Sequence, residues 1–182
     1  MDQELYEKKI SSKQIFKGKI LGLYLDQVQL PNKKIASREK VTHPGAVGIV
    51  PINGQDQVYL VKQFRYPPHQ TLIEIPAGKL DEGEDPINCA QRELKEEVGA
   101  ENGKLIKLAS FYTTPGFCDE LLHMYLALDF KITDNNLDDD EFLHILKFNL
   151  KDSIDMIKNG QIQDAKTIIG LMLARDYINE KK

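Results

Sequence analysis

The chain has 182 residues, of which 41% are hydrophobic and 29% are charged, and its formal net charge at pH 7 is -4. This length and composition fit one folded domain, with room for a small appendage, and exclude global disorder. Without a basic excess, we expect neither a nucleic-acid partner nor a membrane surface. The first residues, "MDQELYEKKI", lack a signal pattern, and no apolar run reaches the roughly 18 residues of a membrane span, so the expected location is the cytoplasm. Cys89 and Cys118 are expected to be free thiols.

The first part of the chain is expected to form strands. Apolar residues with partial alternation fill "QIFKGKILGLYLDQVQL", a turn follows at "LPNKK", and "ASREKVTHPG" would be a returning strand. Asn53-Gly54 is a strong hairpin signal between the next two apolar runs. A short buried strand is expected in "TLIEIP". The expected strands cover 14–30, 36–45, 46–52, 57–64 and 71–76.

Helices and strands are then mixed. Asp85-Pro86 is a good helix start, and Gly99 is a natural stop. Further strands are expected over 104–113, 121–130 and 142–148, and helices over 150–160 and from Asp164 to the end of the chain. The resulting fold class is α+β, with a mixed sheet and about three helices in an α/β/α sandwich.

The helix predicted to end at Gly99 has two distinct faces. Its apolar residues fall within one arc that would face the core, namely Ile87, Ala90, Leu94 and Val98. Glu93, Glu96 and Glu97 share a neighbouring arc, because their spacing is i, i+3 and i+4. The segment therefore presents three carboxylates on one side.

Two interpretations of these carboxylates are open. They form either a solvated acidic face or, in a cleft, a site for a hard cation such as Mg²⁺ or Mn²⁺. The preceding loop, with Gly78 and Gly83, would bring main-chain groups close to the helix and favours the cation site. At such a site we expect a ligand position such as Glu97 to be exposed and to contribute little to the core.

A longer pattern surrounds the acidic helix. Gly78, five residues, Glu84, seven residues and then "RELKEEVG" at 92–99 resemble the Nudix box, the loop-helix signature of the Nudix hydrolases. Ala100 departs from the usual larger aliphatic residue, which weakens a packing contact. The resemblance implies an α/β/α sandwich that uses divalent metal to hydrolyse a nucleoside diphosphate linked to another moiety.

The resemblance also implies roles inside the box. The metal-binding groups would be the carboxylates of Glu93, Glu96 and Glu97 together with the carbonyl of Ala77, with Mg²⁺ as the metal and Mn²⁺ as a substitute. Glu84 and Arg92 match the pair that fixes the loop to the helix. Glu97 and Arg92 are accordingly candidate catalytic residues.

Motifs outside the box resemble one group within the family, the bacterial ADP-ribose pyrophosphatases. Pro115 lies fifteen positions beyond Ala100, and "HPGAVGIVP", "VKQFRYP" and "DAKTIIGL" extend the similarity. This implies hydrolysis of ADP-ribose to AMP and ribose 5-phosphate by a homodimer, with an N-terminal strand extension at 1–42 exchanged or packed across the interface and a Nudix domain at 43–182. The alternatives are another nucleotide sugar or dinucleotide as substrate, or a nucleotide-sensing module without turnover.

The same resemblance suggests residues that bind substrate. Arg65 would lie near the phosphates, although a surface ion pair is the other interpretation. Arg38 and Glu39 match a pair whose arginine reaches the substrate from the partner subunit, and Glu120 would reach the terminal ribose. The remaining candidates are Phe16 or Tyr24, which either stack on adenine or belong to the core, and Gly116, which permits the turn of the loop after Pro115.

In the group that this chain resembles, the general base lies outside the box. Glu141, at the end of "NNLDDDE", aligns with it, and the neighbouring Asp139 and Asp140 are alternatives. The other interpretation of this charge run is a solvated loop.

Overall fold

The computed structural model describes residues 4–134 and 142–181. Two compact units make up the chain: one ends at Gly45 and includes Phe111–Leu121, and the other consists of Ala46–Ser110 and the chain from Leu122 onward. The strands are β1 (Lys8–Lys17), β2 (Gly22–Gln29), β3 (Ile35–Thr42), β4 (Ala46–Pro51), β5 (Gln57–Arg65), β6 (Gln70–Glu74), β7 (Ala77–Lys79), β8 (Ala100–Glu101), β9 (Lys104–Tyr112), β10 (Leu121–Leu128), β11 (Lys131–Ile132) and β12 (Leu143–Asn149). The helices are α1 (Pro86–Val98), α2 (Leu150–Lys158) and α3 (Ala165–Asn179).

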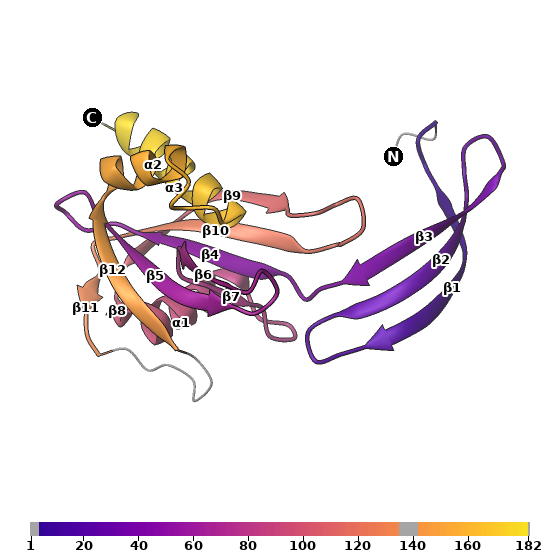
Figure 1. The fold of residues 1–182 in the computed structure, drawn as a ribbon, viewed down its shortest axis with the longest axis horizontal. Helices are drawn as coiled ribbons and strands as arrows, with labels where there is room; N and C mark the ends of the chain where they lie inside the picture. The colour runs from indigo at the N-terminus through magenta and orange to yellow at the C-terminus, as the bar shows by residue number, and fades with distance from the viewer. Residues whose placement is uncertain (1–3, 135–141, 182) are drawn as a thin grey trace. The chain divides into compact units, whose positions relative to one another are not determined.

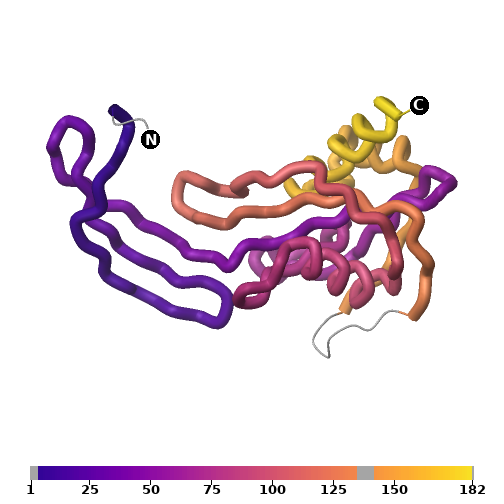
Figure 2. Tube along the Cα trace, turned by 180° about the vertical axis from the view of Figure 1, so that it is seen from behind, coloured from indigo at the N-terminus to yellow at the C-terminus, as the bar shows by residue number. Residues whose placement is uncertain are grey.

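The first unit is built on an antiparallel sheet in which β1, β2 and β3 follow one another in sequence order (Figure 2). A turn closed by a hydrogen bond from Gly18 N–H to the Leu21 carbonyl separates β1 from β2, so the strand expected over 14–30 is in fact two strands. The segment that contains Pro115 is distant from these strands in sequence, yet it forms hydrogen bonds with β3. Val41 N–H donates to the Phe117 carbonyl at 2.7 Å, and Asp119 N–H donates to the Val41 carbonyl at 3.2 Å.

The second unit confirms the predicted mixed sheet and sandwich. Strand order is β7-β4-β10-β9 in one sheet and β12-β5-β6 in another. The β4–β10 pair is parallel, whereas the β4–β7 and β5–β6 pairs are antiparallel. Helix α1 lies on one side of these strands, and α2 and α3 lie on the other (Figure 1).

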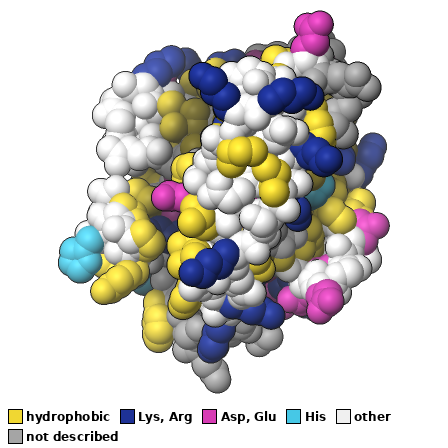
Figure 3. All heavy atoms as spheres, turned by 90° about the vertical axis from the view of Figure 1, so that its right-hand side faces the viewer, with side chains coloured by type: hydrophobic (Ala, Val, Ile, Leu, Met, Phe, Trp, Pro, Cys, Tyr) yellow, Lys and Arg dark blue, Asp and Glu magenta, His cyan; other side chains and the backbone are white. Residues whose placement is uncertain are grey.

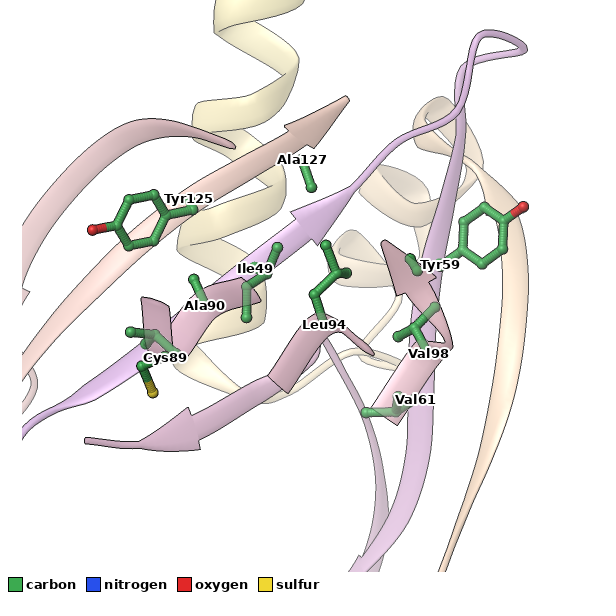
Figure 4. Packing of buried hydrophobic residues seen from close by; sticks show 11 residues of the cluster. Ile49, Tyr59, Val61, Cys89, Ala90, Leu94, Val98, Tyr125 and Ala127 are labelled. Atoms are coloured by element: carbon green, nitrogen blue, oxygen red, sulfur yellow. The ribbon is translucent and has the colours of Figure 1, made fainter. Parts of the chain in front are cut away.

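The residues of β4 explain why helices cover both sides. Val47 and Ile49 pack with Ala90 and Leu94 of α1 in a buried cluster (Figure 4). Val50 lies on the opposite face of β4, toward α3: a Cβ added to Gly170 of α3 would lie 3.0 Å from the Val50 side chain. Both faces of β4 are thus buried, which accounts for its continuous run of apolar residues.

The predicted hairpin at Asn53-Gly54 is only partly correct. A turn does form, since Asp56 N–H donates to the Asn53 carbonyl at 3.1 Å and Asp56 has a φ of 56°. Beyond one bridge between Ile52 and Val58, however, β4 and β5 diverge into different sheets. The local turn signal was right, and the partners of the two strands were decided by the rest of the sheet.

Helix boundaries follow the predicted capping residues. Asp85 accepts a hydrogen bond from Ile87 N–H at α1, and Asp164 accepts one from Thr167 N–H at α3. Gly99 ends α1 in the left-handed conformation with a φ of 68°, which glycine adopts readily. These local signals placed α1 and α3 correctly.

Within the described residues, no helix has the length and apolar character needed to cross a membrane. The expected cytoplasmic location stays a prediction. Cys89 and Cys118 are free thiols, as expected. Burial raises the pKa of Cys89 to about 12, so this thiol stays protonated at neutral pH.

Candidate active site

The carboxylates of α1 are far less exposed than the sequence suggested. Glu93 and Glu97 are only 7% and 3% exposed. Ala77 N–H, at the start of β7, donates to Glu97 Oε2 at 3.1 Å. The expectation of an exposed Glu97 is therefore wrong, because β7 packs against the acidic face of the helix. A buried carboxylate needs partners, so the solvated-face interpretation does not describe these two residues.

Gly78 allows this close packing. A Cβ added at Gly78 would lie 1.8 Å from Glu93 Oε1 and 2.5 Å from Glu93 Oε2. A side chain at this position would therefore strike the Glu93 carboxylate, which would have to move. The first glycine of the box pattern thus marks a close approach between strand and helix.

Arg92 links the loop to the helix, in the pairing that the sequence suggested. Its Nε and Nη2 each donate to a carboxylate oxygen of Glu84 at 3.1 Å. Asp81 N–H also donates to Glu84 Oε2, at 3.0 Å. The two hydrogen bonds from Arg92, and then that from Asp81, lower the pKa of Glu84 to about 2. Glu84 therefore stays ionised and fixes the loop at neutral pH.

We expect Glu84→Gln to lower the unfolding temperature by a few degrees at neutral pH, since it removes a bidentate charged pair. The folded-state pKa of about 2 lies below the ordinary value of 4.5, so the stabilisation is complete above 4.5 and is lost as the pH falls through 2. The difference in unfolding temperature between wild type and variant should accordingly shrink on acidification. Circular dichroism melts at several pH values measure it, and Glu82→Gln, in the same loop but exposed, should show no such trend.

The donor set suits a hard divalent cation. Its members would be the carboxylate oxygens on one helix face and, as the sequence suggested, the Ala77 carbonyl, which are the kinds of ligand that Mg²⁺ and Mn²⁺ prefer. Arg92 Nη1 lies between two of them, 2.7 Å from Glu93 Oε1 and 3.0 Å from Glu96 Oε2. In the parts of the chain that the structure describes, no three Asp, Glu, His or Cys side chains are grouped closely enough to hold a metal ion. To bind one cation together, Glu93 and Glu96 would therefore have to give up their hydrogen bonds with Arg92.

Arg65 forms an ion pair, but with a partner that the sequence analysis missed. Its Nε and Nη2 donate to the two carboxylate oxygens of Glu74, both at 2.8 Å. Glu74 is 1% exposed, whereas the Arg65 side chain is 39% exposed. The Glu74 hydrogen bonds are the largest of the effects that raise the pKa of Arg65, and the charge of Glu97 adds to them. Arg65 thus lies within electrostatic reach of a metal-binding candidate. The glutamate within the apolar segment "TLIEIP" was the signal in the sequence that could have indicated this partner.

Three predicted substrate-binding residues meet in the first unit. Arg38, Glu39 and Gly116 line a cavity of about 390 Å³. Arg38 donates from Nε to Glu7 Oε2 at 2.9 Å and from Nη2 to Glu7 Oε1 at 2.5 Å. Two aromatic side chains that the sequence analysis did not single out, those of Tyr112 and Phe117, also line the cavity. This unit therefore offers charged and aromatic groups around one cavity.

The other candidates in the first unit lie elsewhere. Glu120 accepts a hydrogen bond from Thr113 Oγ1 at 2.6 Å, and its side chain is 3.6 Å from His43 Nδ1. Phe16 is 55% exposed on β1, so the core interpretation does not hold for it. Lys40 Nζ lies 5.0 Å from the centre of the Tyr24 ring. Neither aromatic residue lines the cavity.

The general-base candidates, Asp139, Asp140 and Glu141, lie outside the described residues. Their assignment stays a prediction from the sequence.

Known families and proteins resemble this chain over most of its length. A family model described as NUDIX domain matches residues 42–169, and one described as nucleoside diphosphate sugar hydrolase N-terminal domain matches residues 7–41. The ADP-ribose pyrophosphatase of Bacillus subtilis (strain 168) is 44% identical over 167 residues, which cover 91% of this chain and 90% of that protein. The methanol dehydrogenase activator of Bacillus methanolicus is 42% identical with the same coverage. A crystal structure of an ADP compounds hydrolase matches the fold with a TM-score of 0.87, at 22% identity and 97% coverage of both chains.

Proposed function

Because this chain belongs to the Nudix family, we propose that it is a metal-dependent hydrolase that cleaves the pyrophosphate of ADP-ribose to AMP and ribose 5-phosphate. One observation carries the enzyme class: Glu93 and Glu97 lie buried on one helix face behind a glycine at which a side chain would strike Glu93. The substrate is supported by the similarity to the Bacillus subtilis ADP-ribose pyrophosphatase over nine-tenths of both chains.

Each group of site residues would have a role in the reaction that follows from its chemistry. Carboxylates of Glu93, Glu96 and Glu97, with the Ala77 carbonyl, would hold Mg²⁺, or Mn²⁺ in its place. The cation would neutralise pyrophosphate charge and acidify the attacking water. Arg65 offers a guanidinium to phosphate oxygens. Arg92 keeps the loop against the helix through Glu84, which holds the carboxylate face in place.

The test is a substrate panel with the purified full chain. With Mg²⁺, ADP-ribose should yield AMP and ribose 5-phosphate, separated by chromatography, and EDTA should abolish the reaction. Intact ADP-ribose beside rapid cleavage of another nucleotide sugar or a dinucleotide would overturn the substrate but retain the enzyme class. Binding of nucleotide without cleavage of any member of the panel would instead indicate a sensing module.

We assign the general base to Glu141, which would take a proton from the attacking water. Glu141→Gln is then expected to lower kcat on the order of a hundredfold, the usual contribution of a positioned base, while Mg²⁺ binding is retained. Steady-state kinetics and a metal titration by calorimetry measure the two effects. Asp139→Asn and Asp140→Asn are the matched comparisons. A silent Glu141→Gln beside an inactive Asp140→Asn would transfer the role to Asp140.

The exposed apolar side chains of the first unit support a homodimer that packs through its N-terminal strands. Between Lys8 and Thr42, the span of β1 to β3, five large apolar side chains are more than half exposed: Ile10, Ile15, Phe16, Ile20 and Ile35. Figure 3 shows a face of the molecule on which apolar side chains lie among Lys and Arg. Such a density of exposed apolar residues is typical of an interaction surface. Sedimentation equilibrium tests the proposal, and a monomer mass at all concentrations would overturn it.

A further inference from the structure

Glu74, the last residue of β6, is a buried carboxylate with two cationic partners. It is 1% exposed and directly follows the apolar residues Leu72 and Ile73 of the strand. Arg65 pairs with both of its oxygens, and Lys166 Nζ donates to Oε2 from the first turn of α3. Burial alone raises the pKa of Glu74, yet its two partners hold that pKa below the ordinary value. Glu74 is therefore a fixed anion inside the second unit.

The pairing leaves one edge of the Arg65 guanidinium available. Nε and Nη2 are both directed to Glu74, so the plane of the group is fixed by two parallel hydrogen bonds. In the described part of the chain, no hydrogen bond is found for Nη1. The Arg65 side chain as a whole is 39% exposed, so the residue is accessible from solvent although its carboxylate partner is buried.

The chain around Glu74 is also tied to the acidic face of α1. Ile75 N–H donates to Thr167 Oγ1 at 2.9 Å, which anchors the segment to α3. Two residues later, Ala77 N–H donates to Glu97. Glu74 thus belongs to a short segment that fixes a guanidinium on one side and a candidate metal-binding carboxylate on the other.

We propose that Glu74 is a positioning residue for substrate binding, which acts by holding Arg65 so that its Nη1 edge is presented to a phosphate of the substrate. The inference rests on the proposed function and deepens it. An arginine on a flexible side chain would lose rotamer freedom on binding phosphate. The Glu74 pair imposes this order before the substrate arrives, so Arg65 binds phosphate without having to be ordered first.

The test is a double-mutant cycle in the full chain with Glu74→Gln, Arg65→Ala and the combined variant. Binding of ADP-ribose is measured by calorimetry in EDTA, and KM and kcat are measured with Mg²⁺. Each single change should weaken binding and raise KM roughly tenfold, with a smaller change in kcat, and the double variant should match Arg65→Ala. Additive losses, or unchanged affinity in Glu74→Gln, would overturn the role of Glu74.

Two further variants separate positioning from stability. Leu171→Ala opens a cavity in α3 at a residue that is 0% exposed, so it should lower the unfolding temperature without raising KM. Glu74→Asp keeps the charge on a shorter side chain and should also weaken ADP-ribose binding; wild-type affinity in this variant would contradict the proposal even if Glu74→Gln does not fold. If the wild-type chain neither binds nor cleaves ADP-ribose, the proposed function itself is wrong. If the chain cleaves ADP-ribose but the effects of the Glu74 and Arg65 substitutions are additive, only the inference about Glu74 is wrong.

Discussion

Replacing Glu97 by Gln is expected to lower kcat for ADP-ribose on the order of a thousandfold while the fold is retained. The change removes a buried negative charge from the face that would hold the cation, where electrostatic stabilisation is strongest. It keeps the shape of the side chain, and the Gln carbonyl can still accept the hydrogen bond from Ala77 N–H, now 3.1 Å from Glu97 Oε2. Steady-state rates with Mg²⁺ and a Mg²⁺ titration by calorimetry measure the loss of turnover and of metal affinity.

Glu82→Gln is the matched control, because it makes the same charge change at an exposed position of the loop before α1. Its rate should stay within about twofold of wild type, as expected for a surface substitution away from the site. Thermal melts of both variants should remain cooperative. Wild-type turnover in Glu97→Gln would show that this carboxylate is no metal ligand, whatever its burial.

The accuracy of the sequence predictions depended on how local each signal was. The ends of α1 were predicted because Asp85 and Gly99 act on the backbone next to them. The three glutamates were predicted to share a face because helix geometry alone fixes their spacing. The burial of Glu93 and Glu97 was not predicted, because it depends on β7, which is only three residues long. Exposure is a tertiary property, and the helix sequence does not contain it.

Contacts between distant segments were the ones missed. Arg65 and Lys166 are 101 positions apart in the chain, yet both contact Glu74. The segment with Pro115 pairs with Val41 of β3, which no local pattern indicates. The turn that divides β1 from β2 was missed for another reason: Gly18 lies in a run whose apolar residues continue on both sides, so the run was predicted as one strand despite its only partial alternation.

Gly78→Ala is expected to damage both turnover and stability, although it adds a single methyl group. The added Cβ would lie 1.8 Å from Glu93 Oε1, so either β7 or the Glu93 carboxylate must move. Overpacking of this kind costs about 1–3 kcal/mol, which exceeds the gain of about 0.4–1 kcal/mol from restricting the unfolded chain. Because Glu93 is a candidate metal ligand, we also expect kcat to fall on the order of a hundredfold. Urea unfolding and steady-state kinetics measure the two effects.

Gly54→Ala and Glu93→Asp test whether the steric clash with Glu93 causes the loss of stability in Gly78→Ala. No atom lies within 4 Å of a Cβ added at Gly54, and its φ is not positive, so this control should leave stability unchanged or slightly higher. In the Gly78→Ala background, Glu93→Asp shortens the side chain that is struck and should recover part of the lost stability. Activity should not recover, since the shorter carboxylate no longer reaches its position beside Glu97. Full activity in Gly78→Ala would instead mean that Glu93 moves freely, and the close approach of β7 to α1 would then have no part in catalysis.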